Sequence, residues 1–150
     1  MNSESEKGIY EIEIFKAFCS KLPNTEVTDV AKCIPPKPDL VCNFAGQITY
    51  FELARNYSKE FAQQHFDPLA HDNVFGGEDA TKRILHAKLD KTYLVKEPIH
   101  LLLYDDLGMS CANHLVIQII ENILASREKI QFDKIWYFAE DKVVQVYSAN

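Results

Sequence analysis

The sequence predicts an α/β fold, more specifically α+β, in which helices flank a mixed β-sheet. Short apolar runs rich in β-branched and aromatic residues alternate with segments whose apolar residues recur at helical spacing. A helix that separates two strands requires a crossover connection, which is right-handed and packs the helix onto the sheet. The predicted order of elements is α-β-β-α-β-α-β-β, and residues 27–33 are a candidate for a short extra strand or turn.

The length and composition are those of one globular domain, residues 1–150, with enough apolar side chains for a core. The polar N-terminus is unlike a signal peptide, and no apolar run reaches the roughly 18 residues of a membrane helix. The four cysteines form no C-x-x-C pair, which favours buried thiols in a cytoplasmic protein. The net charge of −6 argues against broad attraction to nucleic acid but allows a local basic patch.

The first predicted helix covers residues 3–22 and ends at Pro23-Asn24. Glu11 falls in the middle of its apolar stripe, in line with Phe15, Phe18 and Leu22. Two interpretations of Glu11 stay open. Its carboxylate either points inward with the stripe, or reaches solvent past a frayed first turn.

Residues 37–54, KPDLVCNFAGQITYFELA, predict two strands joined by a turn at residues 45–47. Pairing these strands as a hairpin brings Asp39 and Glu52 to the same side, near the same edge. Two such carboxylates repel each other unless one is protonated or a cation bridges them, and paired oxygen ligands suit Mg²⁺ or Mn²⁺. Alternatively, Asp39 caps the proline-rich turn and Glu52 pairs with Arg55 or a lysine.

The segment from residue 55 to residue 79 is polar and irregular, with a short helix expected over residues 58–65. His65, His71 and Asp72 lie in this segment, and their spacing matches no metal-ligand motif. A second long helix is predicted over residues 79–94. Lys88 lies within its apolar stripe, where the side chain can snorkel to solvent or reach a buried acidic group.

The remaining predicted elements are a strand, a helix and two further strands. The run HLLLYD at residues 100–105 predicts a central strand covered on both faces. A strongly apolar helix is expected over residues 113–126, followed by strands over residues 134–139 and 143–147.

The order of these residues resembles the PD-(D/E)XK nuclease-like superfamily, which has the restriction-endonuclease-like fold. The resemblance is carried by Glu11, by Pro38-Asp39, by Glu52-Leu53-Ala54, and by the helix RILHAKLDKTY followed by HLLLYDD. It implies a hydrolase, an Mg²⁺- or Mn²⁺-dependent endonuclease acting on phosphodiester bonds of DNA or RNA. It also implies that Asp39, Glu52 and the carbonyl of Leu53 hold the metal, with Glu11 in support and a lysine beside the attacking water.

The sequence departs from the superfamily motif at that lysine, because Ala54 stands two residues after Glu52. Some members of the superfamily supply the lysine from the following helix, so Lys88 is the candidate here, with Lys91 second. A weak enzyme or a retained fold without activity stays open. An inactive domain would act in protein interaction or as a homodimer. Residues 117–124 and 136–138 would suit such an interface, although burial in the core is the commoner fate of apolar segments like these. A small-molecule-binding domain has no phosphate-loop or glycine-rich motif to support it.

Overall fold

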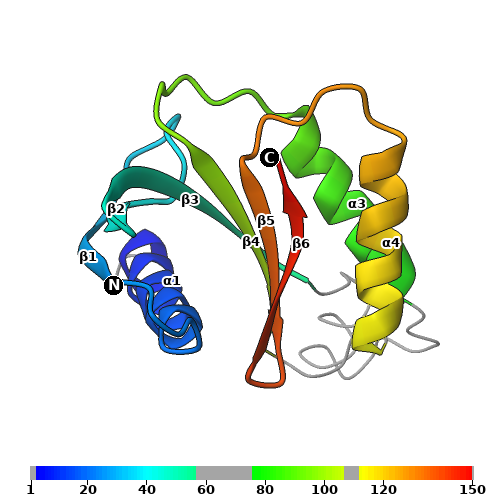
Figure 1. Cartoon of the computed structure of the whole chain (residues 1–150), viewed down its shortest axis with the longest axis horizontal. Coiled ribbons are helices and arrows are strands. Elements are labelled where there is room, and N and C mark those ends of the chain that lie inside the picture. The colour runs from blue at the N-terminus through cyan, green and yellow to red at the C-terminus, as the bar shows by residue number, and fades with distance from the viewer. Residues whose placement is uncertain (1–2, 57–75, 107–111, 150) are drawn as a thin grey trace.

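The computed structural model describes residues 3–56, 76–106 and 112–149. Within these ranges the chain forms a six-stranded mixed sheet and three helices (Figure 1). The expected helix at residues 58–65, together with His65, His71 and Asp72, lies outside the described residues. None of the described helices combines the length and the apolar character that crossing a membrane requires.

The six strands lie side by side in chain order. They are β1 (Val27–Lys32), β2 (Leu40–Phe44), β3 (Gln47–Arg55), β4 (Ile99–Asp105), β5 (Lys134–Ala139) and β6 (Lys142–Ser148). Neighbours joined by short connections are antiparallel, whereas β3, β4 and β5 run parallel to one another. The continuous apolar run of β4 is buried along its whole length, as expected for a central strand.

The helices cover the two faces of the sheet unequally. Helices α3 (Gly76–Asp90) and α4 (Asn113–Ala125) connect the parallel strands and lie on one face, while α1 (Ser3–Cys19) lies on the other (Figure 1). Two crossovers of the same hand that step in the same direction must place both helices on the same face. Each face therefore has its own apolar core, one beneath α3 and α4 and one beneath α1.

Several sequence-based boundaries need correction. The candidate extra strand is present as β1, at the edge of the sheet beside β2. Helix α1 ends at Cys19 rather than Leu22, because the chain tightens there: Lys21 and Leu22 donate backbone hydrogen bonds three residues back, and Asn24 adopts a φ of 58°. Helix α3 ends at Asp90 rather than Leu94.

The apolar segments expected to form an interaction surface belong to the core instead. Ile120 and Tyr137 are almost completely buried, as are most of their apolar neighbours in α4 and β5. Of the two alternatives for residues 117–124 and 136–138, the structure therefore shows burial in the core, and the interpretation as a partner surface is wrong. Their hydrophobicity is accounted for by the contacts of α4 and β5 within the two cores.

Candidate functional site

The β2–β3 hairpin brings Asp39 and Glu52 together, as predicted. Leu40 pairs with Phe51 at the start of β2, so Asp39 lies opposite Glu52 at the next position. The backbone N–H of Asp39 donates to Glu52 Oε1 at 3.2 Å, and the N–H of Leu53 donates to Asp39 Oδ2 at 2.8 Å. Each carboxylate is thus held by the backbone beside the other, which determines the orientation of both.

The carbonyl of Leu53 is the third oxygen that the resemblance implies as a metal ligand. A strand residue directs its N–H and its C=O to the same side, so this carbonyl faces the same neighbour as the N–H bound to Asp39. Continuing the hairpin register places Pro38 opposite Leu53. Proline has no N–H to donate, so the Leu53 carbonyl is left without the ladder hydrogen bond that another residue would supply.

Lys88 supplies the cation at this site. Its Nζ lies 2.7 Å from Glu52 Oε2, while Lys91 Nζ is 3.8 Å from the same oxygen. The Glu52 side chain is only 3% exposed, whereas those of Lys88 and Lys91 are 25% and 49% exposed. The inward angle expected for Lys88 from helix periodicity is therefore confirmed, and its stem carries the ammonium from the rim of α3 to the buried acid.

Ala54, where the resemblance leads us to expect a lysine, packs in the core beneath α3 and α4. It is buried together with Leu85 and Tyr50. A lysine at residue 54 would have to place its stem and charge among these apolar groups, which is costly. An ammonium supplied from α3 reaches Glu52 without passing through the core.

Glu11 is buried, at 4% exposure, so the interpretation that it reaches solvent is wrong. Its Oε1 lies 2.6 Å from Lys32 Nζ of β1. Gly8, one helical turn earlier, leaves room for the lysine stem, because a Cβ at that position would lie 3.3 Å from Lys32 Cε. Helix α1 is on the opposite face from α3, and Glu11 acts on the site through its charge, which raises the pKa of Asp39.

The two central carboxylates have opposite titration behaviour. Burial, followed by the charge of Glu52, raises the pKa of Asp39 to about 6, although the hydrogen bond from the Leu53 N–H acts in the opposite direction. Burial also disfavours ionised Glu52, but the charge and hydrogen bond of Lys88, followed by Tyr93 and Lys91, lower the pKa of Glu52 overall. Near neutral pH Glu52 is therefore ionised, and Asp39 retains a part of its proton.

Two residues of this site were missed as functional candidates in the sequence. Tyr93 is buried, and after burial itself the Glu52 carboxylate is the main cause that raises the Tyr93 pKa. Its hydroxyl makes no hydrogen bond of standard geometry to the described residues, and its ring lies 5.0 Å from Lys91 Nζ. Lys32 was missed because only the pairing of β1 with β2 brings it to Glu11. The helical stripe included Tyr93, but nothing in that pattern linked it to Glu52.

Asp39 and Glu52 are the two carboxylates here that could hold a small divalent cation. Among the described residues, no group of three or more His, Cys, Asp or Glu side chains is arranged to hold a metal. Mg²⁺ commonly binds through one or two carboxylates and keeps several waters. Asp39 Oδ1 makes no hydrogen bond to the residues described, so it is the oxygen of Asp39 that such an ion could bind, and the Leu53 carbonyl is a second hard oxygen on the same side of β3.

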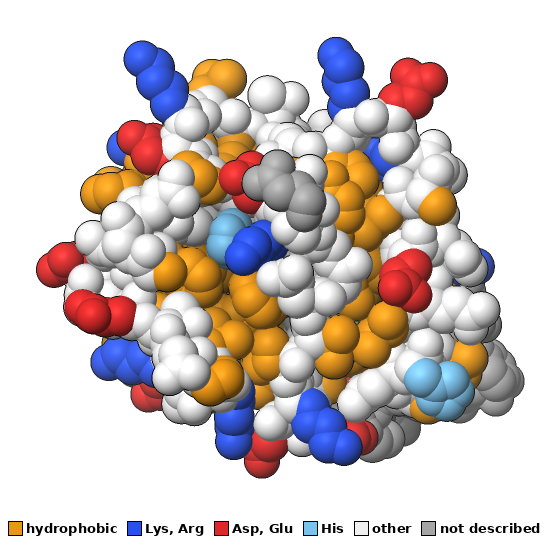
Figure 2. All heavy atoms as spheres, in the orientation of Figure 1, with side chains coloured by type: hydrophobic (Ala, Val, Ile, Leu, Met, Phe, Trp, Pro, Cys, Tyr) orange, Lys and Arg blue, Asp and Glu red, His pale blue; other side chains and the backbone are white. Residues whose placement is uncertain are grey.

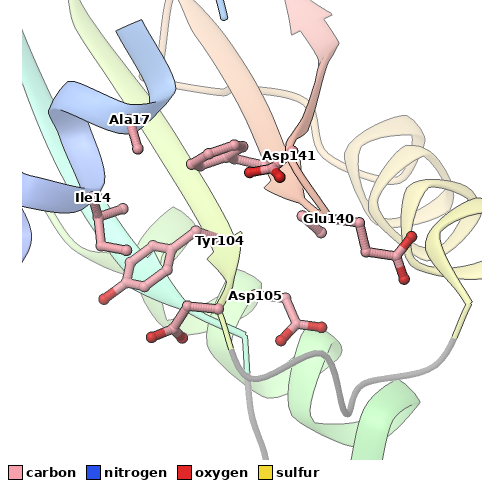
Figure 3. A pocket seen from close by; sticks show the side chains of 9 residues that line it. Ile14, Ala17, Tyr104, Asp105, Glu140 and Asp141 are labelled. Carbon is pink, nitrogen blue, oxygen red and sulfur yellow. The ribbon is translucent and has the colours of Figure 1, made fainter. Parts of the chain in front are cut away.

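A separate cleft lies at the carboxyl ends of β4 and β5, against α1 (Figure 3). It has a volume of about 390 Å³, and its acidic lining residues are Asp105, Asp106, Glu140 and Asp141. None of the predicted catalytic residues lines it. Arg55, one of the two partners considered for Glu52, forms two hydrogen bonds to Asp106 instead, at 2.7 and 2.6 Å, and lies over the ring of Tyr10 in α1. The candidate site is placed at Asp39 and Glu52 because Lys88 of α3 and Lys91, directly after that helix, approach the buried carboxylate there.

No protein-family model, no curated protein and no solved structure matches this chain.

Proposed function

We propose that this chain is a metal-dependent nuclease with a restriction-endonuclease-like fold, and that Asp39, Glu52 and Lys88 form its active site. The observation that carries the proposal is the contact between Lys88 Nζ and Glu52 Oε2, at 2.7 Å. It supplies, from α3, the cation that Ala54 cannot supply from β3. The proposed reaction is hydrolysis of phosphodiester bonds in DNA or RNA.

The roles of the residues follow from their chemistry. Asp39, Glu52 and the Leu53 carbonyl would hold Mg²⁺ or Mn²⁺, and such an ion, when bound, acidifies water and neutralises phosphate charge. Lys88 would orient the attacking water and stabilise negative charge on the phosphate, because its ammonium already lies beside Glu52. Glu11 would act through its charge on Asp39, at a distance from the reacting atoms.

Local positive charge supports a phosphate substrate despite the acidic chain. Lys88 and Lys91 approach Glu52, and the charges of Lys37 and Lys32 both act on Cys33, whose N–H binds the Asp39 carbonyl. Elsewhere, on the face seen in Figure 2, acidic and basic side chains are interspersed. The proposed substrate contact is therefore with the lysines near the site, and the described residues on the face in Figure 2 form no extended basic track.

A binding role without catalysis is the second candidate. The observation that favours it is the pairing of both inward acids, Glu11 with Lys32 and Glu52 with Lys88, since both pairs also stabilise a fold that does no chemistry. In that case the chain would interact with a protein partner or form a homodimer.

The experiment is cleavage of single- and double-stranded DNA and RNA with Mg²⁺ or Mn²⁺. We expect Asp39→Asn, Glu52→Gln and Lys88→Met each to lose activity by about a hundredfold or more, as removal of a preorganised charge does. Glu11→Gln should lose less. Two exposed residues provide matched controls: Lys142→Met and Glu13→Gln should cleave like the wild type.

Metal binding is measured separately, by the change in melting temperature with Mg²⁺ or Mn²⁺. We expect the ions to raise the melting temperature of the wild type and to have little effect on Asp39→Asn, because a ligand that binds only the folded state stabilises it. Clean wild-type protein that neither cleaves nor responds to either ion would contradict the proposal and favour the binding role. Cleavage that survives all three active-site substitutions would place the activity elsewhere.

A further inference from the structure

His100, at the start of β4, is a buried histidine outside the proposed active site. It is 5% exposed and lies on the α1 face of the sheet, with Phe51 and Trp136. Trp136 Nε1 donates a hydrogen bond to His100 Nδ1 at 3.1 Å. Since an indole nitrogen can only donate, Nδ1 must be the unprotonated nitrogen. In the neutral ring, the proton is therefore on Nε2.

The Nε2–H group of His100 has no hydrogen-bond partner among the described residues. The rings of Phe44 and Phe51 lie 5.3 and 4.9 Å from the imidazole, and Trp136 occupies the Nδ1 edge. His100 also borders a cavity of about 200 Å³ that neither Phe51 nor Trp136 lines. Because Nδ1 is turned to Trp136, which does not line the cavity, Nε2–H is the ring donor that His100 can offer there.

Lys134 adds a positive charge to the same cavity. It is the direct neighbour of His100 in the parallel pairing of β4 with β5, and both residues line the cavity. Its Nζ lies 5.8 Å from the centre of the Trp136 ring. Burial, followed by the charge of Lys134, lowers the pKa of His100 to about 4. At neutral pH the ring thus stays uncharged and keeps Nε2–H as a donor beside an ammonium.

We propose that this cavity binds a small oxyanion, a carboxylate or a phosphate, through the Lys134 ammonium and the His100 Nε2–H. Both residues line the cavity, and an ammonium together with a neutral N–H donor is the complement of an anionic oxygen. Asp133 also lines the cavity, so its charge offsets that of Lys134. The site therefore favours a monoanion over a dianion. The volume suits a ligand of a few heavy atoms, below the size of a typical drug-like ligand.

The test uses the intrinsic fluorescence of Trp136, the single tryptophan of the chain. Its indole is hydrogen-bonded to His100, so its emission should respond to a ligand of the imidazole. The wild-type protein is titrated at pH 7 with acetate and, separately, with inorganic phosphate, at constant ionic strength with chloride as the reference. We expect a saturable change with at least one of the two, and the tighter one identifies carboxylate or phosphate as the ligand class. In ¹⁵N spectra of the imidazole, the Nε2–H signal of His100 should move in the same titration.

Lys134→Met should weaken the affinity at least tenfold. Lys142→Met, which removes an exposed lysine that does not line the cavity, should leave it unchanged. The proposal is overturned if neither anion gives a saturable change beyond that of chloride, or if the two lysine variants respond alike. The measurement involves neither nucleic acid nor a divalent metal, so its outcome is independent of the proposed nuclease activity.

Discussion

At the scale of single residues, the pair formed by Lys88 and Glu52 joins a nearly buried carboxylate to a partly exposed ammonium. Such a pair gains little net stability by being present, because both groups lose hydration when it forms. Loss of one partner is costly, because the other charge then remains buried without compensation. The same contact therefore matters for stability whether or not the site is catalytic, so stability and activity have to be measured separately.

Lys88→Met is expected to lower the free energy of unfolding at pH 7 by about 2–4 kcal/mol, because Glu52 loses its nearer cation. Lys91→Met is the matched control and should cost less than about 1 kcal/mol, since an ion pair this exposed contributes little. Urea denaturation of both variants measures the difference. An equal loss of unfolding free energy in the two variants would show that Lys88 does not stabilise Glu52 more than Lys91 does. The double variant Glu52→Gln/Lys88→Met should be more stable than Lys88→Met alone, because it leaves no buried carboxylate without a cation.

Asp39 should make stability fall as the pH rises. Burial, together with the charge of Glu52, raises the pKa of Asp39 from 3.8 to about 6, so the folded protein holds this proton more tightly than the unfolded chain does. The stabilisation that the folded protein gains from binding this proton is complete below about pH 4 and is lost as the pH rises through about 6. Asp39→Asn should thus be more stable than the wild type by about 1–3 kcal/mol at pH 8, with little difference at pH 3.5. Thermal unfolding at the two pH values tests this, and a variant destabilised at both would contradict it.

At the scale of elements, the β2–β3 hairpin determines the geometry of the site. Its turn consists of Ala45 and Gly46, with φ values of 52° and 86°. Two successive positive φ values are typical of the two-residue turn whose twist matches that of the paired strands. The register that follows from this turn places Asp39 opposite Glu52, five pairs away from the turn at the other end of the hairpin. The turn therefore affects the site although it lies far from it.

The turn offers two substitutions with opposite expected effects. Gly46→Ala should lower the free energy of unfolding by about 1 kcal/mol, because an L-residue is strained at this φ. The cost is conformational, since a Cβ at Gly46 would meet no atom within 4 Å. Ala45→Asn should raise stability by a few tenths of a kcal/mol, roughly, because asparagine tolerates positive φ better than alanine. Chemical denaturation measures both, and a stabilising Gly46→Ala would contradict this description of the turn.

At the scale of the whole molecule, the sheet separates two apolar cores. Phe18 of α1 packs against Phe51 and Trp136 on one face, while α3 and α4 pack against the other. Strands β3, β4 and β5 contribute side chains to both cores in alternation. We therefore expect the two cores to unfold together, because disrupting one removes the support of strands that the other also needs.

Phe18→Ala should lower the free energy of unfolding by about 3–5 kcal/mol, as the loss of a fully buried aromatic side chain does. Ile9→Ala on the same helix is the matched control, since Ile9 is 63% exposed, and should change stability by less than about 0.5 kcal/mol. The unfolding curves from Trp136 fluorescence and from far-ultraviolet circular dichroism should coincide in both variants. Separate transitions would show that the cores unfold independently.

Local patterns in the sequence determined most of the helices and strands, and they placed Asp39, Glu52 and Lys88 in the candidate site. Strand alternation and the turn residues predicted the hairpin and the shared side of Asp39 and Glu52, because these depend on neighbours close along the chain. Helical spacing likewise predicted that Lys88 faces inward from α3. The burial of Glu11 was left open, since a charged side chain in an apolar stripe can point either way until its partner is known.

The tertiary structure decided which charges meet. Lys88 reaches Glu52 because the crossover between β3 and β4 lays α3 over the sheet, and Lys32 reaches Glu11 because β1 pairs with β2 beside α1. Likewise, Trp136 binds His100 because β4 and β5 are parallel neighbours. Each of these pairs joins residues at least twenty positions apart in the chain. Sequence spacing carries no information about such distances, so only the packing of the elements could determine these pairs.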